Sequence, residues 1–240
     1  MENDKMKIEI WSDVMCPFCY IGKRKFEKAL EQFPERNSVE IEWKSFQLSP
    51  NMQTDLSMNI NQYLAKHKGI SLAEAGQLND QVTQMAAGVG LEYHFDRSVV
   101  ANSFNAHRFA HFAKANGKQD QAEEMLFKAY FTDGKNIDDY NVLIQLGEEI
   151  GLEPGALKLA LETGQYADAV NSDIEQAKSL GIRGVPFFVF DRKAAVSGAQ
   201  QTPVFLQTLE TSFADWKKQR AFGHTTHLDG ASCSVDGTCD

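Results

Sequence analysis

The motif Cys16-Pro17-Phe18-Cys19 constrains this chain more than any other feature of its sequence. The alternating run Met6 to Trp11 precedes the motif and predicts a strand. The spacing of apolar residues after the motif predicts a helix to about residue 33. The two cysteines therefore lie where a strand leads into a helix.

A cysteine at the start of a helix has altered chemistry. The N–H groups of the first turn have no partner within the helix and carry partial positive charge. They stabilise a thiolate, so a thiol placed there has a pKa below the free value of about 8.5. We expect Cys16 to meet a substrate at the helix mouth and Cys19, three residues on, to lie within its reach on the same face. Pro17 suits the first helical position, because the N–H that it lacks would be unpaired there.

The spacing of the two cysteines leaves three interpretations open. They are a dithiol/disulfide redox pair, half of a metal site, and two inert core cysteines. The strand before the motif and the helix after it favour the redox pair.

The composition of the chain limits the kinds of partner that it can bind and the cell compartment in which we expect it. The chain has 240 residues and a net charge of −9, which argues against nucleic acid or an anionic membrane surface as a partner. The first residues lack the apolar core of a secretory signal, and the apolar run Val185 to Phe190 is far too short to span a bilayer. We therefore expect a cytoplasmic protein, in which the four cysteines serve catalysis, redox sensing or metal binding rather than a disulfide framework.

The predicted structure changes at about residue 50, from a βαβ unit to a helical segment. A second alternating run, 39–48, predicts a strand that pairs in parallel with the first strand in a right-handed βαβ unit. From about 50 to 165 we find no convincing strand and predict a compact all-helical insertion. Its expected helices are 59–68, one begun by a capping box at 71–74, 99–115, 119–131, 137–150 and 154–162.

The remaining elements complete a known layout. We predict a helix at 166–180, a buried strand at 184–190, a paired strand at 194–197 that closes a hairpin, and a final helix from 202 to about 220. The order βαβ then αββα is the thioredoxin layout, an α/β fold with a helical domain inserted after the second strand. We divide the chain into a thioredoxin-like domain at 1–49 and 166–222, an inserted domain at 50–165 and a cysteine-containing tail at 223–240.

Four segments together carry a family resemblance that covers almost the whole chain. They are Ser12-Asp13 with Cys16 to Gly22, Asn102-Ser103 with Ala106 to Arg108, Gly184 to Phe190 with Ser197 to Gln200, and Cys233 to Cys239. On these segments the chain resembles the DsbA-like thiol-disulfide oxidoreductases of the thioredoxin superfamily, and within them the cytoplasmic FrnE-type members. The resemblance implies a helical insertion beside the active site and a cis peptide bond at Val185-Pro186. It also implies disulfide exchange with protein or small-molecule thiol and disulfide substrates, without an organic cofactor.

The position of Pro186 is unusual even without the family resemblance. A proline that opens a buried strand removes a hydrogen-bond donor from the sheet, and X-Pro bonds are the usual place for cis geometry. A cis bond would turn the main chain of Val185 towards the cysteines, where an extended substrate could pair with it by strand addition. The alternative is a trans proline that only starts the strand.

Two other functions stay open. The fold has a branch resembling kappa-class glutathione transferases and 2-hydroxychromene-2-carboxylate isomerases, which typically carry serine where this chain has Cys16. A glutathione-dependent isomerase or transferase would leave Cys19 dispensable, and the presence of both cysteines speaks against it. The third hypothesis is a zinc-binding redox-stress protein built on the same fold.

Three further polar residues, His107, His111 and Asp13, each allow two interpretations. His107 and His111 are four residues apart on one helix face, a spacing that can bind metal, but no third ligand is apparent nearby. Family placement suggests that the face from Asn102 to His107 borders the active-site cleft; the alternative is a helix that only packs on the thioredoxin half. Asp13 either relays protons or tunes the Cys16 thiolate, or it is a polar surface residue.

The tail contains four possible metal ligands, His224, His227, Cys233 and Cys239, whose order and spacing match no common zinc finger. We predict a second redox pair at Cys233 and Cys239, because FrnE-like proteins commonly have such a C-terminal pair. Idle thiols and a metal site are the alternatives.

The sequence thus assigns a site by role. Cys16 is the predicted nucleophile, Cys19 the resolving thiol, and Pro186 completes the catalytic set. The residues predicted to contact substrate are Pro17, Phe18, Val185 and His107. We predict no metal ion in this site, and the sequence carries no signal for the oligomeric state.

Overall fold

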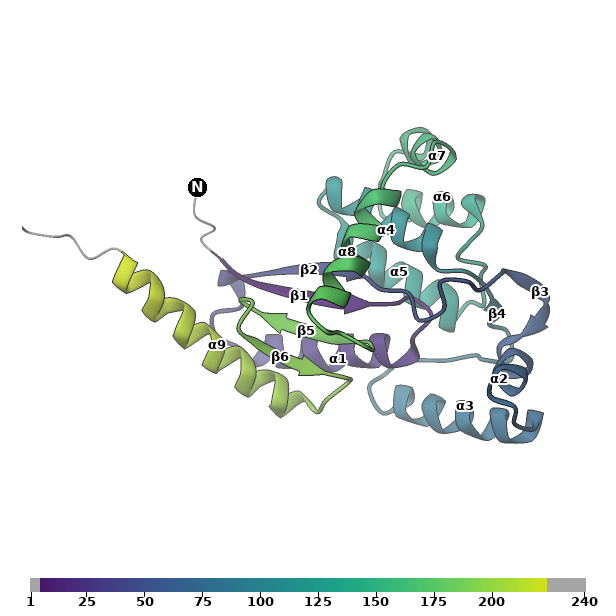
Figure 1. Cartoon of the computed structure of the whole chain (residues 1–240), viewed down its shortest axis with the longest axis horizontal. Helices are drawn as coiled ribbons and strands as arrows, with labels where there is room; N and C mark the ends of the chain where they lie inside the picture. The colour runs from purple at the N-terminus through teal and green to yellow at the C-terminus, as the bar shows by residue number, and fades with distance from the viewer. Residues whose placement is uncertain (1–4, 224–240) are drawn as a thin grey trace, which may run out of the picture.

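The computed structural model describes residues 5–223, and a four-stranded sheet lies at the centre of this part of the chain (Figure 1). Its strand order is β2-β1-β5-β6. β1 (Met6–Ser12) pairs in parallel with β2 (Val39–Ser45), and α1 (Pro17–Gln32) is the crossover between them. β5 (Phe187–Phe190) pairs antiparallel with both β1 and β6 (Ala194–Ser197). The predicted thioredoxin layout is confirmed.

Helices cover both faces of this sheet (Figure 1). α1 and α9 (Thr202–Gly223) pack on one face, and α8 (Ala167–Ser179) packs on the other. Successive side chains of a strand point to opposite faces, so Ile10 joins the main core while Trp11 packs on Ala177 of α8. Within residues 5–223, every helix is too short or too polar to cross a membrane.

The chain between β2 and α8 is mainly helical. Its helices are α2 (Ile60–Lys68), α3 (Leu72–Ala87), α4 (Phe104–Ala115), α5 (Gln119–Phe131), α6 (Tyr140–Glu149) and α7 (Pro154–Glu162). The prediction that this segment holds no strand is wrong. β3 (Asp55–Asn59) and β4 (Val99–Val100) form a two-stranded antiparallel sheet, so the inserted part is not entirely helical. Its division from the rest at residues 50 and 165 stays a prediction.

Polar side chains explain where several helices begin. The predicted helix 99–115 starts late, because Val99–Val100 pairs with β3 and the side-chain oxygen of Asn102 accepts the N–H of Phe104 at 2.8 Å. The predicted helix 137–150 starts at Tyr140, because the carboxylate of Asp139 accepts the N–H of the second helical residue at 2.7 Å. The predicted capping box at 71–74 is confirmed.

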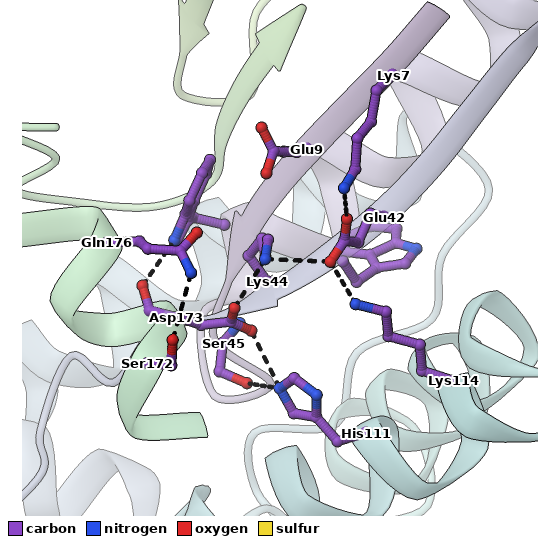
Figure 2. Close-up of polar contacts among 12 residues, drawn as sticks. Lys7, Glu9, Glu42, Lys44, Ser45, His111, Lys114, Ser172, Asp173 and Gln176 are labelled. Atoms are coloured by element: carbon purple, nitrogen blue, oxygen red, sulfur yellow. Dashed lines mark hydrogen bonds and ion pairs between the residues drawn. The ribbon is translucent and has the colours of Figure 1, made fainter. Parts of the chain in front are cut away.

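A buried ion network joins the sheet to the helices of the inserted part (Figure 2). The carboxylate of Glu42 on β2 contacts the ammonium groups of Lys7, Lys44 and Lys114. Burial alone would raise the pKa of Glu42, but hydrogen bonds from these lysines lower it to about 2. The network therefore connects β1, β2 and α4 at one point.

Asp173 of α8 is the second carboxylate of this network (Figure 2). It accepts hydrogen bonds from Lys44 Nζ at 2.9 Å and from the main-chain N–H of Ser45 at 3.0 Å. Its other close neighbour is His111 Nε2, at 3.0 Å from Oδ2. Asp173 thereby holds α8 and α4 against the end of β2, where the chain turns towards the cysteines.

We expect Asp173→Asn to lower the free energy of unfolding by about 3 to 5 kcal/mol, because it removes the main partner of a buried cation. The side chain of Lys44 is only 9% exposed, so its charge cannot be hydrated in place of the lost contact. Denaturant unfolding at neutral pH measures the change. Glu175→Gln on the same helix is the matched control: among the described residues its carboxylate pairs with exposed Lys178 alone, and we expect a loss below about 1 kcal/mol. Equal losses in the two variants would contradict this role of Asp173.

Candidate active site

The cysteine motif lies at the junction of β1 and α1. Cys16 is the N-cap of α1, with extended backbone (φ −86°, ψ 112°), and Pro17 is the first helical residue, as predicted. The main-chain N–H of Cys19 donates to the Cys16 carbonyl at 3.0 Å. Both cysteines are free thiols in the structure. Cys16 is 4% exposed and Cys19 is 0% exposed, so Cys16 is the more accessible sulfur.

The loop before β5 meets the motif from the opposite side. The Val185-Pro186 peptide bond is cis, which confirms the expectation for it. Cys16 Sγ lies 3.5 Å from the Val185 carbonyl oxygen, so the thiol donates a hydrogen bond to that oxygen. Gly22 lets Pro186 approach α1, because a Cβ at Gly22 would lie 3.0 Å from Pro186 Cγ. The structure thus brings together the predicted residues of the motif and those of this loop.

Cys19 occupies a different environment from Cys16. Burial raises the pKa of the Cys19 thiol well above its ordinary value, and the neighbouring Cys16 thiol raises it further. The Ser12 hydroxyl and the main-chain N–H of Asp13 offset part of this effect. Cys19 is therefore held as a thiol in the interior, while Cys16 is at the surface end of the motif.

Two aromatic residues shape the motif, Phe18 within it and Tyr93 beside it. Phe18 is 38% exposed, so its ring forms part of the surface beside Cys16. Tyr93, in the loop after α3, donates its hydroxyl to the Pro17 carbonyl at 2.8 Å. Its ring stacks on Phe131 of α5, with 4.6 Å between centroids. Sequence reasoning missed Tyr93; the only signal was an aromatic residue in an otherwise patternless loop.

Asp13 lies beneath the motif and not at the surface. It is 0% exposed, so the interpretation of Asp13 as a surface residue is wrong. Its carboxylate accepts the main-chain N–H of Leu48 at 2.8 Å and that of Met15 at 3.3 Å. His107 Nε2 lies 3.6 Å from the same carboxylate. His107 is 1% exposed, so it lies in the interior rather than on a face that a substrate meets.

A buried glutamate on α5 completes this polar region. Glu123 is 3% exposed, and burial raises its pKa to about 7, although the nearby His107 opposes the shift. Burial lowers the pKa of His107, but Asp13, together with Glu123 and the main chain of Phe46, more than compensates, and the net shift is upward. Sequence reasoning missed Glu123. The signal was available, because Glu123 shares a helix face with the buried Phe127 and Tyr130.

The two histidines of α4 contact different groups. His107 faces Asp13, whereas His111 faces Asp173 and lies 3.2 Å from the Ser45 hydroxyl. Among residues 5–223, no group of three or more possible ligands is placed to hold a metal ion. The tail residues His224, His227, Cys233 and Cys239 lie outside the described residues.

Comparison with known proteins identifies the family of this chain. A family model described as the DSBA-like thioredoxin domain matches residues 7–210. The uncharacterized protein YwbO of Bacillus subtilis is 31% identical over 219 residues, which cover 89% of this chain and 98% of YwbO. The crystal structure of a probable DsbA oxidoreductase from Streptomyces coelicolor has a TM-score of 0.81 at 34% sequence identity, with 98% of each chain covered.

One structural likeness concerns fold alone. A 2-hydroxychromene-2-carboxylate isomerase has a TM-score of 0.61 at 16% sequence identity, covering 92% of this chain and 100% of its own. The two relatives above 30% identity resemble this chain in sequence as well as in length, and the family model matches most of the chain. The chain belongs to the DsbA-like thioredoxin-domain family of thiol-disulfide oxidoreductases.

Proposed function

We propose that this protein exchanges disulfides with protein or small-molecule substrates through Cys16 and Cys19. The observation that carries the proposal is the unequal placement of the two thiols. Cys16 caps a helix N-terminus beside the Val185 carbonyl, and Cys19 lies fully buried behind it. A helix N-terminus favours an anion, so the attacking thiolate belongs on Cys16.

The reaction has two sulfur transfers. The Cys16 thiolate attacks one sulfur of a substrate disulfide; a bond forms between them, and the second substrate sulfur leaves with the bonding electron pair and takes a proton. Cys19 then loses its proton and attacks Cys16 Sγ, and the first substrate sulfur leaves as a thiolate. The substrate gains two electrons, and the Cys16 and Cys19 dithiol becomes a disulfide. In the oxidising direction each step reverses.

The residues around Cys16 contact the substrate or fix the geometry of the site in this proposal. Val185 offers main-chain groups next to Cys16 with which an extended substrate segment can pair. The exposed ring of Phe18 offers apolar contact at the same place. Pro17 is the first helical residue, and Pro186 packs against Gly22 of α1. We assign these four residues to substrate contact and site geometry.

A second redox pair at Cys233 and Cys239 remains part of the proposal. α9 runs in the same direction as α1, because its Lys217 pairs with Glu35 beyond the carboxyl end of α1. The last turn of α9 therefore lies at the end of α1 opposite the cysteine motif (Figure 1). Exchange between the two pairs would require Cys233 or Cys239 to reach Cys16. Cytoplasmic location also remains a prediction from the sequence.

Catalysis of disulfide reduction and of thiol oxidation tests the proposal. The reduced protein should accelerate the reduction of insulin disulfides by dithiothreitol, and the oxidised protein should form disulfides in a reduced substrate. The competing function, a glutathione-dependent isomerase or transferase, predicts a non-redox product and specific glutathione binding. Absence of acceleration in both directions would overturn the proposal.

A further inference from the structure

Tyr93 brings a hydroxyl group from the inserted part to the first turn of α1. The hydroxyl donates to the Pro17 carbonyl at 2.8 Å, and Tyr93 as a whole is 4% exposed. Its ring stacks on Phe131 with 4.6 Å between centroids and meets the Phe95 ring edge-on at 5.6 Å. These contacts hold the ring from the side of the inserted part, so the position of the hydroxyl does not depend on the cysteine motif.

The loop that carries Tyr93 is itself fixed to the carboxyl end of α5. The main-chain N–H of His94 donates to the Phe131 carbonyl at 2.7 Å. The Thr132 hydroxyl donates to the Glu92 carbonyl at 2.7 Å. Both neighbours of Tyr93 in the sequence are therefore hydrogen-bonded to the end of one helix, and Tyr93 presents a fixed donor to α1.

The peptide unit between Pro17 and Phe18 lies between the Tyr93 hydroxyl and Cys16. Its carbonyl accepts from Tyr93, and its N–H belongs to Phe18, the second residue of α1. The side chain of an N-cap residue such as Cys16 accepts from the N–H of the second or third helical residue. The N–H of the third residue, Cys19, already donates to the Cys16 carbonyl at 3.0 Å. The Phe18 N–H is therefore the donor best placed for the Cys16 sulfur.

Ionisation changes which partners the Cys16 sulfur needs. As a thiol it donates to the Val185 carbonyl oxygen, at 3.5 Å. A thiolate has no proton to donate and is stabilised by N–H donors of the first helical turn instead. A hydrogen bond accepted by a carbonyl polarises its peptide unit and strengthens the N–H donor of the same unit. The Tyr93 hydroxyl can therefore act on a Cys16 thiolate across a single peptide unit.

The Tyr93 hydroxyl keeps its proton while Cys16 ionises. Burial raises the pKa of Tyr93 well above its ordinary value. Cys16, Tyr20 and Cys19 raise it further, and Arg24 opposes the shift. The hydroxyl is therefore a donor over the whole pH range in which a thiol exchanges disulfides.

We propose that Tyr93 is a positioning residue for disulfide exchange. By donating to the Pro17 carbonyl, its hydroxyl fixes and polarises the Pro17–Phe18 peptide unit, whose N–H stabilises the Cys16 thiolate. This inference rests on the proposed function and deepens it. A tyrosine that only packs between the two parts of the chain would affect the stability of the fold and leave the reactivity of Cys16 unchanged.

Tyr93→Phe is the informative variant, because it removes the hydroxyl and keeps the ring. The first readout is the rate at which iodoacetamide alkylates Cys16 as a function of pH, in full-length chains whose other three cysteines are replaced by serine. We expect the midpoint of this profile to move upward by about 0.3 to 1 pH unit in Tyr93→Phe, because the thiolate has lost support. The alkylation rate well below the midpoint should fall by about two- to tenfold.

Tyr130→Phe is the matched control. Tyr130 is also buried and its ring also meets Phe131, with 4.9 Å between centroids. Its hydroxyl has no hydrogen-bond partner among the residues that the structure describes. We therefore expect Tyr130→Phe to keep the alkylation profile of the parent protein.

The second readout is the equilibrium of Cys16 and Cys19 with glutathione, in chains that carry Cys233→Ser and Cys239→Ser, at a pH above both alkylation midpoints. Loss of support for the thiolate disfavours the reduced form, so the ratio of disulfide to dithiol should rise by about two- to tenfold in Tyr93→Phe. A midpoint or an equilibrium that stays at the parent value, or equal shifts in Tyr130→Phe, would overturn the inference. A parent protein that never forms the disulfide between Cys16 and Cys19 would instead overturn the proposed function.

A measurement on the reduced parent protein covers the case in which Tyr93→Phe does not fold. The amide proton of Phe18 is followed by nuclear magnetic resonance while the pH is raised through the alkylation midpoint. We expect its resonance to move downfield with that midpoint, because the N–H then donates to the Cys16 thiolate. A Phe18 amide resonance that does not respond to the ionisation of Cys16 would overturn the inference.

Discussion

Cys16→Ser is expected to reduce insulin disulfides no faster than the buffer does, a loss of at least about a hundredfold in rate. A serine hydroxyl is not ionised near neutral pH and cannot form the covalent sulfur intermediate. Nothing else in the described site can take over the attack, because Cys19 is fully buried behind Cys16. The turbidity of reduced insulin with dithiothreitol as the electron donor measures the rate.

The control for this variant is an equally drastic change to serine away from the site. Leu159 of α7 is 57% exposed, so Leu159→Ser should keep the parent rate. Thermal unfolding of Cys16→Ser should show the same cooperative transition as the reduced parent protein. A folded Cys16→Ser protein that retained turnover would rule out the assignment of Cys16 as the nucleophile.

Cys19→Ser should stop the reaction half way. Cys16 keeps its place at the helix N-terminus and still attacks the substrate, but no second thiol is present to release the product. We expect about one substrate cysteine bound covalently per chain and a turnover rate reduced by about a hundredfold. Mass spectrometry of the intact protein under non-reducing conditions measures the adduct.

Two results of this experiment discriminate between functions. The adduct should disappear on treatment with dithiothreitol, and it should not form in the double variant Cys16→Ser, Cys19→Ser. Full turnover by Cys19→Ser would favour the glutathione-dependent alternative, in which the second cysteine is dispensable. That outcome would contradict the proposed division of roles.

The parts of the site that follow from the local sequence were predictable. Cys16 and Cys19 lie at the start of α1 because the change from alternating to helical periodicity is encoded in neighbouring residues. The hairpin after Pro186 was also predictable, because its two strands and their turn are encoded in neighbouring residues. The cis bond was expected mainly through family resemblance and is present.

Other features depend on contacts between distant segments and had little local signal. Asp13 is buried because Leu48, in the loop after β2, and His107 of α4 approach it, and no local sequence pattern predicts that approach. Glu123 shares a helix face with buried residues, but its own burial depends on the residues of other elements that pack over it. Val99–Val100 pairs with β3 although α2 and α3 lie between them in the sequence, and two residues are too few to show a strand periodicity.

The most direct measurement is the redox equilibrium of Cys16 and Cys19 in glutathione buffers. The protein is equilibrated at a series of glutathione to glutathione-disulfide ratios, quenched with acid and alkylated, and its peptides are identified by mass spectrometry. We predict one reversible disulfide that joins Cys16 to Cys19, with a fraction that follows a two-electron couple. Two cysteines that stay reduced at every ratio, or that acquire glutathione separately without ever bonding to each other, would contradict the proposed mechanism.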